Sequence, residues 1–303
     1  MKKRLYYILT LLIIAAAVII AQSWQNIVPQ IHARAPQHVL TMRAFDVGQG
    51  DATLVITPSG KTILIDGGPD DTVMDKLGRA LPFFKKDIDL MILTHPHSDH
   101  VTGLVSVLKR YKVKEIYYTG TVHTSSVFIE WLKLIKEKQI PMHIVSYQEE
   151  LQFDEGVKLA FLYPDHELAE VEEASEEKRG QRKNNLNNTS IVFKIAYGRT
   201  QFLFMGDAEA PVEETLLASG ADLRADVLKA GHHGSHSSTS EDFLKAVSPR
   251  YATISAGRNN DYGHPHLSTL KRLERFGVYA YRTDTEGDIT IMSDGEKIID
   301  AVH

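Results

Sequence analysis

Four side chains of types that bind metals lie within the short stretch His95–His100, which reads His-Pro-His-Ser-Asp-His. The stretch follows an apolar segment, Ile88–Thr94, and precedes a segment with helical periodicity, so it lies at a predicted strand-to-helix junction. Imidazole and carboxylate ligands together suit zinc, manganese or iron better than calcium. The spacing lets His95 and His97 face one ion. Asp99 and His100 would turn toward a second ion at the start of the helix. A histidine-rich surface turn is the weaker interpretation.

Two later segments offer further metal ligands. Asp207 follows an apolar strand and Gly206, which allows a sharp turn at the strand end. An N-cap for the next helix is a compatible second role for this aspartate. His232 and His233 lie just past another predicted strand. Because successive residues of an extended chain point in opposite directions, only one of these two histidines is expected to bind directly.

A third histidine pair lies near the C-terminus. His264 and His266 flank Pro265, which favours an extended backbone before it. In a phosphodiester hydrolase one of them would protonate the leaving oxygen, since an unperturbed imidazole has a pKa of about 6.5. A loop that caps a helix beginning at Ser268 is an equally good interpretation. The serines of Ser235–Ser238 could donate to a phosphate, or could simply cap the following helix.

The elements that must position these side chains alternate between strands and helices. This rhythm predicts two sheets packed together with helices outside. His166–Asn188 departs from it, being charged and poor in apolar residues, and is interpreted as a solvated excursion. The predicted strands are Leu40–Val47, Thr53–Thr57, Thr62–Asp66, Ile88–Thr94, Glu115–Tyr118, His143–Val145, Leu159–Leu162, Ser190–Ile195, Gln201–Met205, Val227–Ala230 and Tyr251–Ser255, with further strands at the end. The predicted helices are Val73–Leu81, Val101–Tyr111, Ser126–Lys138, Glu209–Ser219, Ser240–Ala246 and Ser268–Phe276.

The chain's 303 residues can bury one large core or two small ones. A net charge of -5 gives no overall basic surface for nucleic acid, so a polyanion would need a local patch or metal ions. The absence of cysteine excludes disulfides, thiolate metal sites and a cysteine nucleophile.

The N-terminus carries Lys2, Lys3 and Arg4 before an apolar run, Leu5–Ala21. This pattern predicts an export signal or anchor with a tether over residues 1–36, followed by a hydrolase domain over 37–303. An uncleaved membrane helix is favoured over cleavage after Ala21. With the positive end inside, the body faces outward. It would lie at the extracellular face of the cytoplasmic membrane, or be secreted.

The His-x-His-x-Asp-His motif resembles that of the metallo-β-lactamase superfamily. The resemblance implies an α/β fold, a four-layer αββα sandwich preceded here by the N-terminal hydrophobic helix, with the metals at the sheet edge. Asp66 matches the family's early aspartate, which supports the metal histidines. Asp207 matches the aspartate that bridges two metals. Alignment of residues 231–233 with the family's Pro-Gly-His pattern favours His233 over His232.

Further segments resemble the extracellular metallo-hydrolase domain of the ComEC competence proteins. They are Phe45–Ala52, Asn187–Ser190, Leu228–Ser235 and Gly263–His266. The resemblance implies an outward-facing nuclease, so we expect an exported phosphodiesterase that acts on extracellular DNA, preferably single-stranded. Two divalent ions, zinc or manganese, would be its cofactors. No protein partner is inferred, and the membrane would be a partner only through an uncleaved N-terminal helix.

One departure from the wider superfamily concerns the first ion. Many members have a third histidine where this chain has Asn187–Ser190, which leaves His95, His97 and Asp207 and makes manganese or magnesium plausible beside zinc. Alternative functions are hydrolysis of a lactone, a β-lactam or a phosphocholine ester, or nucleic-acid binding without turnover. The predicted metal ligands are His95, His97, Asp99, His100, Asp207 and His233 or His232. The residues expected to take part in hydrolysis are Asp66, Asp99, Asp207, His264 and His266.

Overall fold

Fifteen strands form two sheets in the computed structural model, which describes residues 38–168 and 185–302. The predicted anchor and tether, and most of the charged excursion, lie outside the described residues. Among the described residues no helix is long and apolar enough to cross a membrane. Sheet A consists, in spatial order, of β15 (Ile298–Val302), β14 (Ile289–Ser293), β1 (Leu40–Ala44), β2 (Thr53–Ile56), β3 (Thr62–Ile65), β4 (Asp87–Ile92), β5 (Lys112–Tyr118) and β6 (Met142–Ile144).

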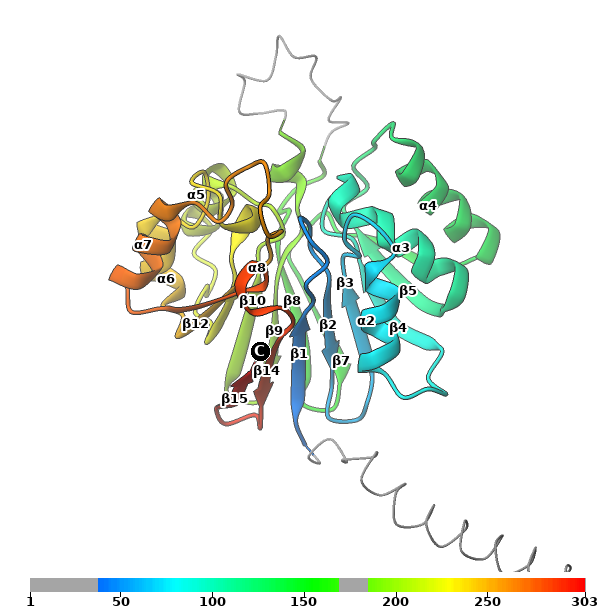
Figure 1. The fold of residues 1–303 in the computed structure, drawn as a ribbon, viewed down its shortest axis with the longest axis horizontal. Coiled ribbons are helices and arrows are strands. Elements are labelled where there is room, and N and C mark those ends of the chain that lie inside the picture. Colours follow the sequence, from blue (N-terminus) through cyan, green and yellow to red (C-terminus); the bar gives the residue numbers. More distant parts are fainter. Residues whose placement is uncertain (1–37, 169–184, 303) are drawn as a thin grey trace, which may run out of the picture. The chain divides into compact units, whose positions relative to one another are not determined.

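The second sheet has seven strands and faces the first (Figure 1). Sheet B is antiparallel from β7 to β10 and parallel from β10 to β13. In spatial order it consists of β13 (Tyr279–Arg282), β12 (Tyr251–Ile254), β11 (Val227–Lys229), β10 (Thr200–Phe204), β9 (Val192–Tyr197), β8 (Val157–Tyr163) and β7 (Glu149–Asp154).

Alternation of side chains along the strands builds the core between the sheets. In β3, Ile63 and Ile65 face sheet B, whereas Leu64 faces the helices on the other side. β4 is buried on both faces, which is why its sequence is a continuous apolar run at Leu90–Ile92. On the side of sheet B, Phe193 stacks on Phe204 with ring centroids 5.0 Å apart.

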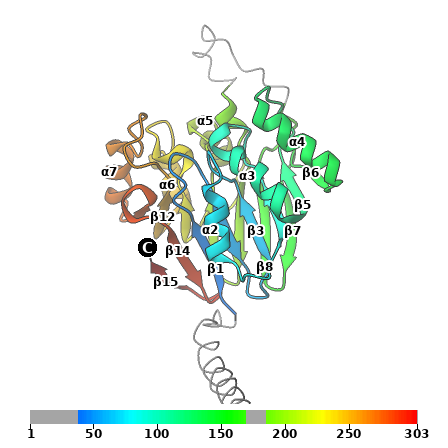
Figure 2. The same cartoon turned by 45° about the vertical axis from the view of Figure 1, so that its right-hand side comes forward.

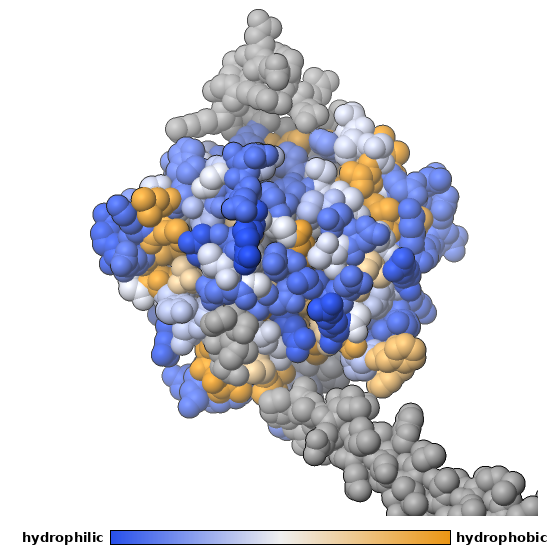
Figure 3. Space-filling model, in the orientation of Figure 1, coloured by the Kyte–Doolittle hydropathy of each residue, from blue (hydrophilic) through white to orange (hydrophobic). Residues whose placement is uncertain are grey.

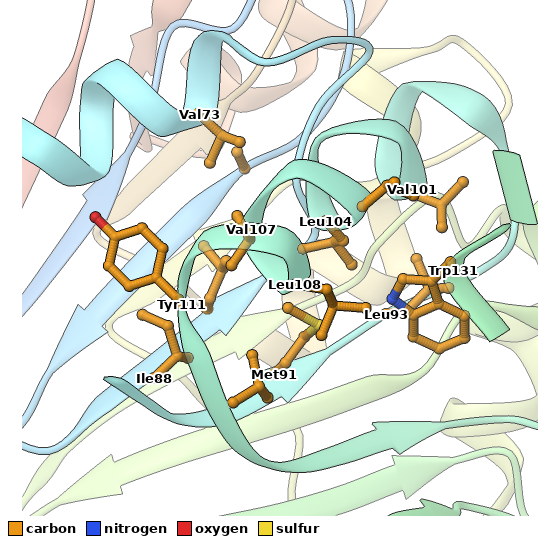
Figure 4. Packing of buried hydrophobic residues seen from close by; sticks show 14 of the residues in the cluster. Val73, Ile88, Met91, Leu93, Val101, Leu104, Val107, Leu108, Tyr111 and Trp131 are labelled. Carbon is orange, nitrogen blue, oxygen red and sulfur yellow. The ribbon is translucent and has the colours of Figure 1, made fainter. Parts of the chain in front are cut away.

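Helices cover the outer face of each sheet, as the two views in Figures 1 and 2 show. Figure 4 shows the packing on sheet A, where Trp131 lies beside Leu93 and Leu108 lies beside Met91. Sheet A is covered by α2 (Thr72–Ala80), α3 (Ser98–Arg110) and α4 (Ser126–Lys138), and sheet B by α5 (Ala210–Ala218), α6 (Glu241–Val247) and α7 (Leu267–Arg275). The short helix α8 (Thr283–Glu286) and two 3-10 turns, η3 (Leu186–Thr189) and η4 (Gly231–Gly234), complete the described elements. The predicted sandwich of two sheets flanked by helices is therefore confirmed.

Local differences from the sequence-based expectation are small but informative. β7 was not predicted, because it is an edge strand whose residues are mostly polar and of which only Phe153 is buried. Leu186 and Asn187, at the end of the predicted solvated excursion, are buried. That part of the prediction is wrong, because these residues form η3 and pack beside the site described next.

Candidate metal centre

The predicted metal ligands gather where strands of both sheets end. His95 and His97 follow β4, and His97 is the N-cap of α3. Asp207 follows β10 through Gly206, which has a φ of 52°. A Cβ on Gly206 would lie 2.9 Å from Thr94 Cβ, so only glycine fits there. The helix after Asp207 begins at Ala210 with Glu209 as its N-cap, so Asp207 does not have the second role considered for it.

Asp99, His100, Asp207 and His233 form a four-residue cluster, with one ligand atom from each within 4.8 Å of the others. His233 Nε2 lies 3.3 Å from both Asp99 Oδ2 and Asp207 Oδ2. His100 Nε2 lies 3.4 Å from Asp207 Oδ1. The arrangement brings side chains of α3 together with side chains from the ends of β10 and β11.

His95 and His97 lie beside this cluster, with the ring centroid of His95 4.2 Å from that of His100. His95 Nε2 is 2.9 Å from His97 Nδ1 and 3.9 Å from Asp207 Oδ2. His95 is fully buried, whereas His97 is partly exposed. Asp207 therefore lies close to a histidine of each predicted ligand pair, as a carboxylate shared by two ions would.

Buried polar atoms without partners test whether these residues suit a cation. His100 Nε2, His233 Nε2 and Asp207 Oδ1 have no hydrogen-bond partner among the described residues. Leaving such atoms unpaired in a protein interior is costly. All three belong to the four-residue cluster, so the site fits a divalent cation with nitrogen and oxygen ligands.

The charges of the cluster agree with this test. Burial disfavours a charged ring, but the carboxylates of Asp207, Asp66 and Asp99 outweigh it and raise the pKa of His100 well above its usual range. Burial would raise the pKa of Asp207, but His233 and His100 hold it well below its usual range. The buried carboxylates thus demand positive charge, which either protonated histidines or a bound cation would provide.

Asp66 supports the ligands from behind, as expected for the early aspartate. It directly follows β3 and has a φ of 56°. Its carboxylate accepts hydrogen bonds from Thr94 N (2.8 Å) and Thr94 Oγ1 (2.7 Å). It also accepts one from His100 Nδ1 (2.8 Å), which orients His100 Nε2 toward Asp207.

His232 and His233 do not lie on an extended chain. The expectation that they point in opposite directions therefore assumed the wrong backbone conformation. Both are left-handed, with φ of 46° and 52°, within η4. His233 Nδ1 donates to Ser255 O (3.0 Å), which aims its Nε2 at the cluster. His232 is farther away, with Nε2 4.0 Å from Asp207 Oδ2, and its Nδ1 is paired with Glu209 Oε1 at 3.0 Å. The geometry places His233 inside the cluster and His232 at its border.

His264 lies beside this border, with its ring centroid 5.3 Å from that of His232. Burial, followed by the charges of His232 and His233, lowers the pKa of His264 to about 4. A ring with this pKa is neutral at pH 7, which suits hydrogen bonding better than proton donation. His266 is the N-cap of α7, and its Nδ1 accepts from His236 N (3.1 Å). His266 therefore holds the serine-rich turn in place, as a helix-capping loop would.

Sequence reasoning missed the ion pair between Asp51 and Lys229 behind the cluster. Lys229 Nζ lies 2.7 Å from Asp51 Oδ2, with 3% and 5% of their side chains exposed. Asp51 Oδ1 lies 3.5 Å from His233 Nδ1, on the side opposite the ligand atom. Gly50 brings Asp51 close to α3, since a Cβ on Gly50 would lie 2.3 Å from Asp99 O. The available signals were a lysine inside an apolar strand and an aspartate after a glycine turn.

Comparisons with known proteins agree with this geometry. The family model for the metallo-β-lactamase superfamily matches residues 45–258. ComE operon protein 3 of Bacillus subtilis is 30% identical over 261 residues, which cover 80% of this chain and 32% of that protein. Competence protein ComA of Neisseria gonorrhoeae is 29% identical over 263 residues, covering 83% of this chain and 32% of that protein. This chain therefore spans about a third of the length of these relatives.

The comparison with solved structures concerns the fold alone. The metallo-β-lactamase fold protein YhfI of Bacillus subtilis superposes with a TM-score of 0.54 at 14% identity, covering 84% of this chain and 100% of that chain. The resemblance to ComEC-like competence proteins seen in the sequence is confirmed by the two curated relatives. With its family model, its two sheets flanked by helices and its clustered ligands, the chain belongs to the metallo-β-lactamase superfamily.

Proposed function

We propose that this hydrolase cleaves phosphodiester bonds of nucleic acid outside the cytoplasm, with single-stranded DNA as its preferred substrate. The convergence of Asp99, His100, Asp207 and His233, with ligand atoms within 4.8 Å of one another, is the observation that carries the hydrolytic chemistry. The nucleic-acid part is supported by the similarity to competence proteins.

Different residues of the chain would have different roles in this reaction. His95 and His97 would hold one ion with Asp207, and Asp99, His100 and His233 would hold a second ion that shares Asp207. Two divalent ions, zinc or manganese, would supply a water of lowered pKa and positive charge for a phosphate oxygen. Asp66 fixes the orientation of His100. His264, buried and neutral at pH 7, would orient an oxygen of the substrate at the border of the site.

An exposed aromatic ring beside the site supports a nucleic-acid substrate. Tyr262 is 67% exposed and stacks on His264, with ring centroids 5.7 Å apart and planes 21° apart. Asn260 fixes this loop, because its Nδ2 donates to Gly257 O (2.8 Å) and its Oδ1 accepts from Tyr262 N (3.1 Å). A fixed, exposed ring offers an unpaired base a stacking surface. Bases within a duplex are already stacked, so this feature favours single strands.

The experiment compares Asp207→Asn with Asp75→Asn in the full chain, by gel-resolved cleavage of labelled single- and double-stranded DNA. Manganese, magnesium and zinc are added separately. Asp207→Asn removes the shared negative charge and should lower cleavage by several orders of magnitude. Asp75 is exposed on α2, and its variant should match the wild type. Elemental analysis should show up to two ions in the wild type and a loss of mainly one in Asp99→Ala.

Two results would contradict the proposal in different ways. Absence of cleavage with every metal, together with turnover of nitrocefin, a lactone or a phosphocholine ester, would change the substrate class and leave the metal site intact. Absence of bound metal after supplementation would contradict the site itself. The location is tested by a reporter fused after His303, since activity of a reporter that works only in the cytoplasm would refute export.

A further inference from the structure

Two adjacent phenylalanines project into solvent from the loop between α2 and β4. Phe83 is 91% exposed and Phe84 is 77% exposed, the highest values of any large hydrophobic side chain among the described residues. The loop has a defined shape, because Leu81 is buried and Lys85 N donates to Pro82 O (2.8 Å). A neighbouring pair of fully solvated aromatic rings on a fixed loop is typical of a surface that contacts a partner.

Exposed basic side chains occur in the loop of this pair and in the segments next to it. Lys86 Nζ lies 5.3 Å from the centroid of the Phe83 ring, and Lys86 O accepts a hydrogen bond from Lys112 N. Arg79 near the end of α2 and Arg110 at the end of α3 are also exposed. Within residues 38–168 and 185–302, none of these four basic side chains forms an ion pair. We call this surface the basic aromatic corner; it consists of Arg79, Phe83, Phe84, Lys86, Arg110 and Lys112.

Two acidic residues beside the corner, Asp87 and Asp89, are paired with lysines. Asp89 Oδ2 lies 3.4 Å from Lys85 Nζ, and Asp89 Oδ1 accepts from Lys114 Nζ at 2.5 Å. Asp87 Oδ2 lies 3.6 Å from Lys85 Nζ and 3.4 Å from Lys114 Nζ. The corner is therefore positively charged, although the whole chain has a net charge of -5.

The corner lies at the sheet edge remote from the metal centre. β1, β3, β4 and β5 run in the same direction, so their starts share one edge of sheet A. The loop that carries Phe83 leads directly into β4, and the described chain begins at His38, just before β1. Figure 1 shows the start of β1 and the loop after α2 at the same lower end, and Figure 3 shows hydrophobic atoms exposed there. The ligands His95 and Asp66 follow the opposite ends of β4 and β3.

We propose that the basic aromatic corner docks on the surface of an anionic lipid bilayer. Aromatic side chains favour the bilayer interface, and exposed lysines and arginines favour anionic headgroups. The sequence before His38 points to the same occupant, since Lys2–Arg4 and the apolar run Leu5–Ala21 precede this edge. A membrane anchor at Leu5–Ala21 would keep the body near the bilayer without orienting it, because the roughly 16 residues from Gln22 to Gln37 can span at most about 55 Å.

Docking through this corner orients the enzyme. The metal centre then faces away from the bilayer, toward the aqueous phase from which a soluble polymer would arrive. Docking depends on the exposure and charge of the corner, so the same orientation of the enzyme would serve any soluble substrate of the site.

The test uses the full chain reconstituted in vesicles of phosphatidylcholine with or without phosphatidylglycerol. Because the chain has no cysteine, Pro82→Cys supplies a single thiol for a fluorescent label next to Phe83. Ser126→Cys, exposed at the start of α4 near the opposite edge, gives the reference label. Nitroxide lipids should quench the label at position 82 but not the label at position 126. Quenching should increase with phosphatidylglycerol and decrease with salt.

Variants separate docking from simple tethering. In the Pro82→Cys background, Phe83→Ser/Phe84→Ser should lower the equilibrium constant for docking at least about tenfold. Each of Lys86→Gln and Lys112→Gln should lower it about fivefold on anionic vesicles. The matched control, Ile129→Ser/Tyr147→Ser, removes two other exposed hydrophobic side chains (54% and 59% exposed) and should leave quenching unchanged.

Three outcomes would overturn the proposal. The first is equal quenching at positions 82 and 126, and the second is quenching at position 82 that persists in the double phenylalanine variant. The third is energy transfer between labels on different copies that rises with protein density while lipid quenching stays absent, because the corner would then bind a second copy.

Discussion

Replacing Lys229 with methionine is expected to destabilise the protein strongly, because the Asp51 carboxylate would remain buried without its counter-ion. Their side chains are 3% and 5% exposed, and the charged atoms lie 2.7 Å apart. Burial would raise the pKa of Asp51, but the charge of Lys229 and contacts with His233 hold it below its usual range. Removing one partner of a buried ion pair costs about 3–5 kcal/mol. For a domain of this size, that lowers the thermal midpoint by roughly 6–20 °C.

The double variant Asp51→Asn/Lys229→Met tests the cause of this loss. It removes both charges and keeps both side chains near their original sizes, so no charge stays buried and unpaired. It should therefore be more stable than Lys229→Met alone. The coupling energy from the complete cycle should be roughly 2–3 kcal/mol, within the range for residues in direct contact.

The assay is unfolding of the full chain in mild detergent, followed by fluorescence of the buried Trp131. Each variant is measured with chelator and again with manganese, because the pair contacts His233. Lys133→Met is the matched control, since this lysine on α4 is 61% exposed and forms only surface ion pairs. It should change stability by less than about 0.5 kcal/mol. Additive effects of the two single variants, or equal losses in Lys229→Met and Lys133→Met, would refute the reasoning.

Three further sets of variants test other parts of the structure. Gly103→Ala should destabilise the protein by at least about 2 kcal/mol, because its Cβ would lie 1.9 Å from a carbonyl oxygen after β3. Gly78→Ala has nothing within 4 Å of its Cβ and should stabilise the protein by about 0.5–1 kcal/mol. Equal urea midpoints of the two variants would contradict this. Burial would raise the pKa of Asp89, but hydrogen bonds from Lys114 and a threonine lower it. The charged carboxylate therefore stabilises the folded state at every pH above its pKa in the unfolded chain, which is about 4. Asp89→Asn should therefore lower the thermal midpoint at pH 7, and a difference from wild type that fails to shrink below pH 4 would exclude this role. Tyr262→Ala should weaken binding of single-stranded DNA about tenfold in fluorescence anisotropy without metal, while Tyr262→Phe should not; equal affinities of the two variants would exclude stacking.

Much of the fold could be predicted because its signals are local. β4 is a continuous apolar run, and the His95–His100 motif follows it immediately. The strand, the turn and the helix can therefore be predicted from one stretch of sequence. β7 could not be predicted in this way. It is held by backbone pairing to β8, and its side chains are mostly polar.

The site was only partly predictable for the same reason. The types and spacing of its histidines and aspartates indicated a metal centre, but not how distant segments meet. The left-handed backbone at His232 and His233 depends on packing around η4, and the pairing of Asp51 with Lys229 joins two sheets. The lysine in an apolar strand and the aspartate after a glycine turn are visible in the sequence, but nothing local indicates that they pair or that the histidine backbone is left-handed.

The predicted ligands come from two different sheets, so binding of a metal depends on the folding of both sheets. His95, Asp99 and His100 belong to the half built on sheet A, whereas Asp207 and His233 belong to the half built on sheet B. A cation shared among them would act as a crosslink between the halves, and this crosslink could form only after both have folded. At a free metal concentration 100 times the dissociation constant, such a ligand adds about 2.7 kcal/mol to the stability of the folded state. Metal scarcity would then shorten the lifetime of the protein against proteases before it limits turnover.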